Sequence, residues 1–103
     1  MDEYRKLHPE DEAYIRTLVT EKKLVIGPFH SQLDCFICNG ESVINNLRLG
    51  MQSAENLGYV SRVAYLPDSF GHSWDFPKIF HQFGIKDFVI TRGVGDDYKL
   101  GSE

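Results

Sequence analysis

Side chains that can act as a nucleophile, a metal ligand or a counter-cation follow three short apolar runs of the sequence. They are Asp34 after Leu24–Ile26, Asp68 and His72 after Arg62–Leu66, and Arg92 after Phe88–Thr91. In parallel α/β sheets and barrels the chemistry gathers at the carboxyl ends of the strands. If the three runs are such strands, we expect these side chains to face one crevice.

Asp68 is the candidate around which the others are arranged. Pro67 precedes it and stiffens the backbone, as a nucleophile or a metal ligand requires. The alternative is a turn residue, because Asp-Ser is also ordinary turn and helix-capping chemistry. His72 could share a metal with Asp68 or orient it by a hydrogen bond, or it could be a satisfied structural histidine. Two ligands do not make a zinc site, which takes three or four protein groups.

Arg92 and the nearby aromatic rings have both a functional and a structural interpretation. Arg92 could neutralise an ionised Asp68 or bind a substrate hydroxyl, although arginines at strand ends are often only surface ion pairs. Phe70 and Trp74 could stack on a sugar, and core packing explains them at least as well. Tyr65 lies within a predicted strand, and we expect it in the core.

The spacing of apolar residues predicts helices that alternate with these strands. The predicted helices are residues 9–23, residues 41–57 ended by Gly58, and residues 76–83 capped by Asp75 and ended by Gly84. This alternation is typical of an α/β fold with three parallel strands joined by crossover connections. Residues 93–103, which contain three glycines among acids, are predicted to form a loop that leads onward.

Length and composition are those of one soluble globular domain that spans residues 1–103. The chain is 42% hydrophobic and 25% charged, with a formal net charge of -4 and no cluster of Lys and Arg. Nucleic acid is therefore not expected as a partner, because phosphate binding needs such a cluster. No apolar run approaches the roughly 18 to 20 residues of a membrane span, and the first residues lack the order of a secretion signal. We expect a cytoplasmic protein without a membrane partner.

The two cysteines, Cys35 and Cys38, have the spacing of a redox motif or of half a structural zinc site. The apolar residues between them and the following Asn39-Gly40 favour a loop, whereas a redox motif needs a helix N-terminus. No second pair of Cys or His completes a closed zinc site. We expect two reduced, partly buried thiols.

Four stretches of the sequence resemble glycoside hydrolase family 38, the zinc-dependent α-mannosidases, and in particular its bacterial members. They are Ile26–Phe29 with Gln32 and Asp34, Asn39–Leu47 with Leu49–Gly50, Val63–His72, and Phe83–Ile85 followed by Thr91–Gly93. The resemblance covers nearly the whole chain. Its most specific part is Leu66–His72, which looks like the nucleophile motif of the family and stands at a matching distance from Arg92.

The resemblance implies a retaining α-mannosidase in which Asp68 is both the nucleophile and one zinc ligand. It implies that Phe70 lines the mannose subsite, that Arg92 lies beside and supports the nucleophile, and that Asp34 binds substrate from the preceding loop. His72 is implied as structural support. The nucleophile would form a mannosyl-enzyme ester that water cleaves with help from a second carboxylic acid. Zinc in this family is thought to bind sugar hydroxyls, which differs from its water-activating role in proteases.

The implied fold is a partial (β/α) barrel of the glycoside hydrolase and deacetylase type, and essential groups are expected outside the 103 residues. The family's His-x-Asp zinc motif, its acid/base carboxylate and a further histidine ligand have no counterpart here. Cys35 and Cys38 stand where relatives more often have an acidic and a small residue. We expect a fragment that depends on the remainder of a parent enzyme to act on an α-mannoside, and that neither works nor retains the zinc ion alone.

Two other interpretations remain open at this point. One is a non-catalytic carbohydrate-binding or regulatory α/β module, and the other is a metal-dependent deacetylase, which would need His and Asp ligands beyond Asp68 and His72. In each case a small parallel sheet has two unpaired edges, and helices built to pack on absent neighbours expose apolar faces. We therefore expect the isolated chain to self-associate.

Overall fold

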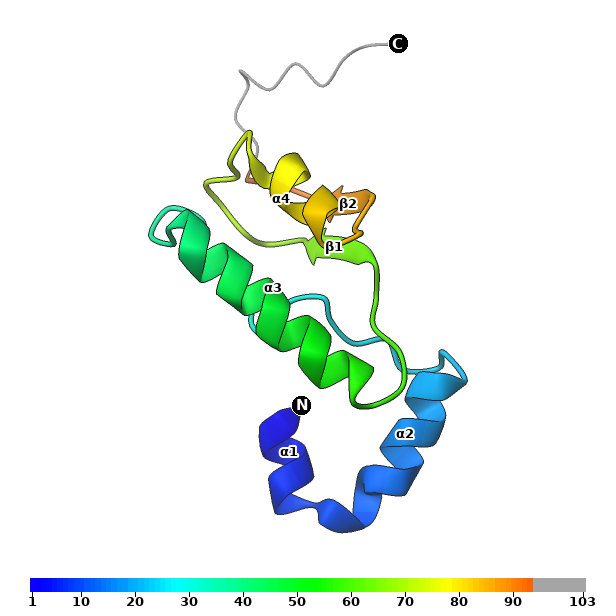
Figure 1. Cartoon of the computed structure of the whole chain (residues 1–103). Coiled ribbons are helices and arrows are strands. Elements are labelled where there is room, and N and C mark those ends of the chain that lie inside the picture. Colours follow the sequence, from blue (N-terminus) through cyan, green and yellow to red (C-terminus); the bar gives the residue numbers. More distant parts are fainter. Residues whose placement is uncertain (94–103) are drawn as a thin grey trace.

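The computed structural model describes residues 1–93, and residues 94–103, which include most of the predicted C-terminal loop, lie outside the described part. The elements in chain order are α1 (Asp2–Leu7), a 3₁₀ turn η1 (Pro9–Asp11), α2 (Glu12–Thr20), α3 (Gly40–Glu55), β1 (Val63–Leu66), α4 (Phe76–Gln82) and β2 (Asp87–Ile90) (Figure 1). None of the helices among the described residues is long and apolar enough to cross a membrane.

The sheet consists of β1 and β2, which pair in parallel and are joined through α4. The register places Val63 opposite Asp87 and Leu66 opposite Ile90, so that both strands end at the same edge. The predicted alternation of helices with parallel strands is confirmed for this β1–α4–β2 unit. The predicted helix over residues 41–57 is confirmed as α3, and the one over residues 9–23 is divided into η1 and α2.

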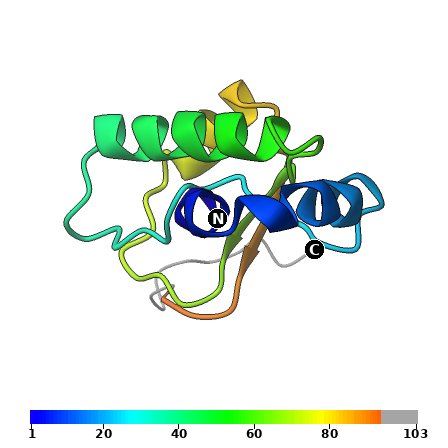
Figure 2. The same ribbon diagram turned by 90° about the horizontal axis from the view of Figure 1, so that it is seen from below.

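One face of the sheet carries the main core, because α3 and α4 pack on the same side of the two strands (Figure 2). The core joins buried residues of α3, β1, α4 and the flanking loops: Leu33, Val43, Leu47, Ala64, Leu66, Phe76, Phe80 and Ile85. A second cluster fixes α2 to the end of α3 through Ile15, Val19 and Leu57. Gly58 and Gly84 adopt positive φ angles of 114° and 71°, as their predicted roles at helix ends require.

The expectation of a third strand at Leu24–Ile26 is wrong for the described residues, which form a sheet of two strands. The backbone N–H groups of Lys23 and Leu24 are taken by the carbonyl of Leu18 at the end of α2. Gly27 then turns the chain with a φ of 77° and precedes a cis bond to Pro28. Between these two constraints one sheet-like bond forms, from the N–H of Ser61 to the carbonyl of Ile26 at 3.1 Å.

Two side chains also lie in environments that the sequence did not predict. Tyr65 is 53% exposed, because Ala64 and Leu66 point to the core and the alternation of a strand sends Tyr65 to the opposite face. That face also exposes Val89, the register partner of Tyr65. Asp75 makes no capping bond to α4, because its backbone is already helical and its carboxylate pairs with Lys78 at 3.2 Å.

Helix α3 and the segment 28–30 are in close backbone contact at Gly50. A Cβ atom on Gly50 would lie 2.3 Å from each of three backbone atoms, the carbonyl oxygen of Pro28, the carbonyl carbon of Phe29 and the amide nitrogen of His30. Backbone atoms cannot move aside as the end of a flexible side chain does. Position 50 therefore requires glycine for this contact.

We predict that Gly50→Ala destabilises the chain by about 1–3 kcal/mol, the usual cost of overpacking, because the segment 28–30 must move off α3. Gly40→Ala is the matched control, since a Cβ atom there meets nothing within 4 Å. The free energy of unfolding, measured with urea and far-UV circular dichroism, should fall for Gly50→Ala alone. Equal stability of the two variants would contradict the close contact.

Candidate active site

The loop that follows β1 and the residues that follow β2 are joined by side-chain to backbone contacts. Thr91 Oγ1 donates a hydrogen bond to the carbonyl of Pro67. The buried His72 places Nε2 3.3 Å from the carbonyl of Arg92, and since a carbonyl only accepts, Nε2 is the donor. The ring of His72 also makes T-shaped contacts with the rings of Phe76 and Phe88. His72 thus lies under the loop, in the structural role that the resemblance implied.

Asp68 and Arg92 form an ion pair at the edge where both strands end. Arg92 Nε lies 2.5 Å from Asp68 Oδ1, and Arg92 Nη2 contacts the same oxygen. Both contacts go to Oδ1, and within residues 1–93 the other oxygen, Oδ2, has no hydrogen bond or ion pair. The side chains of Asp68 and Arg92 are 68% and 63% exposed. The carboxylate is therefore oriented by a cation and still open to solvent.

Phe70 completes this group. The guanidinium carbon of Arg92 lies 5.5 Å from the centroid of the Phe70 ring, within the range of a cation–π contact, and the ring is 45% exposed. The structure therefore brings together three of the residues that the sequence singled out, namely Asp68, Phe70 and Arg92. Their roles in a reaction stay predictions.

Gly93 and Gly71 allow the loops around this group to touch, which the sequence reasoning did not foresee. Both have a φ of 81°. A Cβ atom on Gly93 would lie 2.2 Å from the carbonyl oxygen of Ser69, and one on Gly71 would lie 2.8 Å from the ring of Phe36. The glycines in the motifs were the available signal, but the partner of each becomes visible only in the fold.

Asp34 lies in a tight turn next to this group and does not join the ion pair. Its Oδ1 accepts from the N–H of Phe36 at 3.2 Å, and its backbone carbonyl accepts from Ile37 and Cys38. The next residue, Cys35, donates its N–H to the carbonyl of Phe70 at 3.1 Å. The described structure contains no hydrogen bond or ion pair from Asp34 to Asp68 or Arg92. The side chains that follow β1 and β2, Asp68 and Arg92, thus contact each other directly, as expected. The Asp34 loop contacts this group through a backbone hydrogen bond, from Cys35 to Phe70.

Cys35 and Cys38 are free thiols and half-buried, as expected. Burial raises the pKa of the Cys35 thiol, and the neighbouring Cys38 and Asp34 raise it further. A thiol that resists ionisation is a poor nucleophile and a poor metal ligand.

The residues around Asp68 do not by themselves form a zinc site. Among residues 1–93, the group of possible ligands whose atoms come within 4.8 Å of one another is His8, Glu10 and Asp11. That group lies at the junction of α1 and η1, and Asp11 there already accepts a hydrogen bond from Tyr4. Asp68 belongs to no such group, so residues 1–93 do not bring together around it the three ligands that a zinc site takes.

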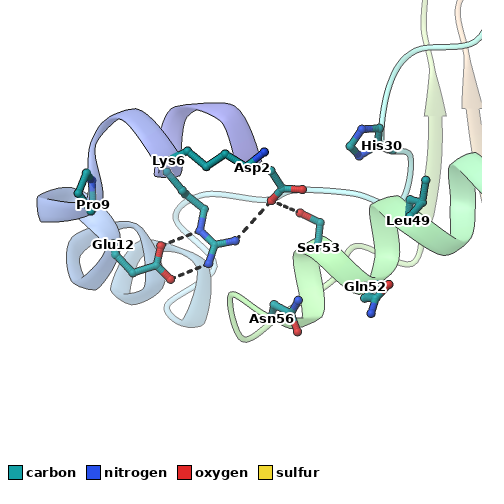
Figure 3. Close-up of a pocket in the computed structure, with 10 residues that line it drawn as sticks. Asp2, Lys6, Pro9, Glu12, His30, Leu49, Gln52, Ser53 and Asn56 are labelled. Atoms are coloured by element: carbon teal, nitrogen blue, oxygen red, sulfur yellow. Dashed lines mark hydrogen bonds and ion pairs between the residues drawn. The ribbon is translucent and has the colours of Figure 1, made fainter.

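A cavity of about 630 Å³ lies away from the strand ends, between α1, the start of α2 and α3 (Figure 3). Three of the charged groups that line it, Asp2, Arg5 and Glu12, are already paired with one another. Arg5 binds both carboxylate oxygens of Glu12, at 2.6 and 2.8 Å, and contacts Asp2 at 3.4 Å, while Ser53 donates to Asp2 at 2.5 Å. These contacts attach α1, a helix that the sequence reasoning did not predict, to α3. We interpret the cavity as a joint between helices.

Comparison with known proteins shows the family to which the chain belongs. Residues 1–99 match the Glycosyl hydrolases family 38 N-terminal domain, and the chain therefore belongs to glycoside hydrolase family 38. It is 34% identical over 95 residues to a putative mannosylglycerate hydrolase from Halalkalibacterium halodurans, a match that covers 91% of this chain and 11% of that protein. It also resembles the crystal structure of an alpha-mannosidase from Enterococcus faecalis V583, with a TM-score of 0.81 and 27% identity, over 86% of this chain and 10% of that one.

The family resemblance read from the sequence is thus confirmed, and the chain spans about a tenth of the length of these two relatives. A mixed α/β fold with two parallel strands, similar to that of the solved relative, is established for the described residues.

We predict that acid weakens the joint formed by Asp2, Arg5 and Glu12. The hydrogen bond from Ser53 holds the pKa of Asp2 below its usual value, and the bond from Arg5 does the same for the pKa of Glu12. Carboxylates with lowered pKa values stabilise the fold above their unfolded values, about 3.9 for Asp and 4.3 for Glu, and this stability is lost as the pH falls through the folded values. Unfolding free energies measured from about pH 6 downwards should show the loss.

Asp2→Asn and Glu12→Gln should each reduce the dependence of stability on acid. Asp87→Asn serves as a control, because Asp87 is exposed and makes no ion pair among residues 1–93. The proposed joint is wrong if all three variants retain the acid dependence of the parent chain.

Proposed function

We propose that the chain contributes the nucleophile to an α-mannosidase that hydrolyses terminal α-mannosides with retention of configuration. The observation that carries this proposal is the Asp68–Arg92 pair, in which Oδ1 is held and Oδ2 is open. A nucleophilic carboxylate needs a fixed direction together with one accessible oxygen. Membership of family 38 supports the glycosidase class, and the relatives named above support mannosides as substrates.

In the proposed reaction Asp68 Oδ2 attacks the anomeric carbon while the bond to the leaving group breaks. The product is a mannosyl ester of Asp68, and water then cleaves this ester with retention. Arg92 orients the carboxylate through Oδ1, Phe70 offers its exposed ring to the mannose, and Asp34 binds substrate from the neighbouring loop. As the family resemblance implies, the acid that protonates the leaving group is proposed to lie outside residues 1–93.

Asp68 is also proposed as one zinc ligand. Bound zinc would supply a Lewis acid for sugar hydroxyls, and the remaining ligands must come from outside the described residues. On this proposal the chain alone neither retains the ion nor turns over substrate, and it needs the remainder of a parent enzyme. A cytoplasmic location also stays a proposal.

The test uses the proposed complete enzyme and an aryl α-mannoside as substrate. Asp68→Asn should lower kcat about a thousandfold or more. That corresponds to about 4 kcal/mol of lost transition-state stabilisation. The matched control is Asp75→Asn, another exposed carboxylate with a cationic partner, Lys78. NMR detection of the first-formed anomer should show retention. Full activity of Asp68→Asn, or an inverted product, would refute the proposal.

Purified chain with added zinc should show no turnover of the same substrate. Binding of mannosides without turnover by the complete protein would favour the alternative of a non-catalytic carbohydrate-binding module.

We further propose that the isolated chain self-associates through the open face of its sheet, where Tyr65 and Val89 are neighbours. Parallel sheets are normally covered on both faces, and a second copy can cover this one. Sedimentation velocity at increasing concentration should show a dimer or larger species, and Tyr65→Glu should shift it to monomer. Tyr14→Glu is the control, since Tyr14 is 66% exposed on α2. A monomer at every concentration would contradict the proposal.

A further inference from the structure

Helix α3 presents two unlike residues, one helical turn apart, to the segment that leads to Asp34. Residues four positions apart lie on the same helix face, and here they are Asn46 and Gly50. Gly50 lets the backbone of Pro28–His30 lie directly on the helix. Asn46 contacts the next residues of the same segment, so the two act on one short piece of chain.

The side chain of Asn46 makes four hydrogen bonds to this segment. Its Oδ1 accepts from the N–H groups of His30, at 2.8 Å, and Ser31, at 3.4 Å. Its Nδ2 donates to the carbonyl of Ser31, at 2.9 Å, and to Ser31 Oγ, at 3.1 Å. The backbone carbonyl of Asn46 also lies 3.2 Å from the N–H of His30. A helix and an irregular segment cannot form the regular backbone hydrogen bonds that join two strands. The side-chain amide of Asn46 supplies the hydrogen bonds between them instead.

The following residues are fixed one after another up to the candidate active site. Gln32 Nε2 donates to the carbonyl of Tyr65 in β1 at 3.4 Å. Leu33 is buried in the main core. Cys35 then binds the carbonyl of Phe70. The chain is thus held on both sides of Asp34, at Leu33 and at Cys35. The backbone held in this way orients the exposed carboxylate of Asp34.

We propose that Asn46 is a positioning residue, which sets the backbone of residues 30–35 so that Asp34 meets the substrate bound at Asp68 and Phe70. The inference rests on the proposed function and deepens it, because a residue of α3 would then help to determine how tightly the enzyme binds its substrate. Asn46 itself touches no substrate. Its removal should therefore affect substrate binding through Asp34 and leave the reacting carboxylate in place.

The kinetic test uses the complete enzyme and an aryl α-mannoside. Asn46→Ala should raise KM about tenfold with kcat changed less than about twofold, since it weakens an interaction made equally in the ground state and the transition state. Asn45→Ala is the matched control, because Asn45 is the exposed neighbour with the same side chain, and that side chain makes no hydrogen bond among residues 1–93. Asn46→Asp keeps the acceptors for His30 and Ser31 and loses the donors, so its KM should be intermediate.

A double-mutant cycle shows whether Asn46 acts through Asp34. Asp34→Asn keeps the Oδ1 acceptor that closes the turn and removes the charge. In that background Asn46→Ala should raise KM less than it does in the parent enzyme, because residues that act as a unit are not additive. Additive effects would overturn the inference, as would a loss confined to kcat, which is what a merely destabilised enzyme shows.

Hydrogen exchange separates failure of this inference from failure of the proposed function. In Asn46→Ala the amides of His30 and Ser31 should exchange faster, whereas those of β1 and β2 should not change. If the parent enzyme hydrolyses mannosides through Asp68 and these two amides are unaffected, the positioning role is wrong and the function stands. If Asp68→Asn retains full activity, the proposed function fails, and this inference falls with it.

Discussion

The contact between the loop after β1 and the residues after β2 is the constraint on which the candidate site depends. Pairing of the strands places Leu66 beside Ile90, but it does not determine where the chain goes beyond the sheet. Thr91 and His72 fix that course through two backbone carbonyls, those of Pro67 and Arg92. The ion pair of Asp68 with Arg92 forms between two segments whose backbones are already joined, so little further backbone freedom has to be lost to form it.

Helix α3 supplies the second constraint, because two different faces of the helix make contacts. Its apolar side covers the sheet with Val43 and Leu47, which is the usual task of a helix in an α/β fold. Asn46 and Gly50 hold the irregular segment 28–31, which follows the expected first strand, Leu24–Ile26. A segment without ladder partners must satisfy its backbone groups by side chains, so it depends on individual residues more strictly than a strand does.

The sequence predicted the parts of the fold that follow from local periodicity. The stretch that became α3 has a helical stripe and a terminal glycine, and β1 and β2 are short apolar runs, so each could be recognised alone. Leu24–Ile26 has the composition of a strand as well, but whether its N–H groups are free depends on Leu18, which no local pattern reveals. Likewise the nearness of Asp68 to Arg92 follows from parallel strands, whereas the contacts of Gly93 and Asn46 join segments distant in sequence.

In this site, the residues that stabilise the fold differ from those proposed to take part in the reaction. Asp68 and Arg92 are about two-thirds exposed, and exposed ion pairs contribute little to stability. The groups that place them, such as the buried His72 and the close-packed Gly93, belong to the packed part of the chain. A carboxylate that the fold holds in place, yet does not need for its own stability, is expected of a reacting group more than of a structural one. Its placement by the backbone also means that residues 1–93 can orient the proposed nucleophile without the acid and the further zinc ligands that the proposed reaction requires.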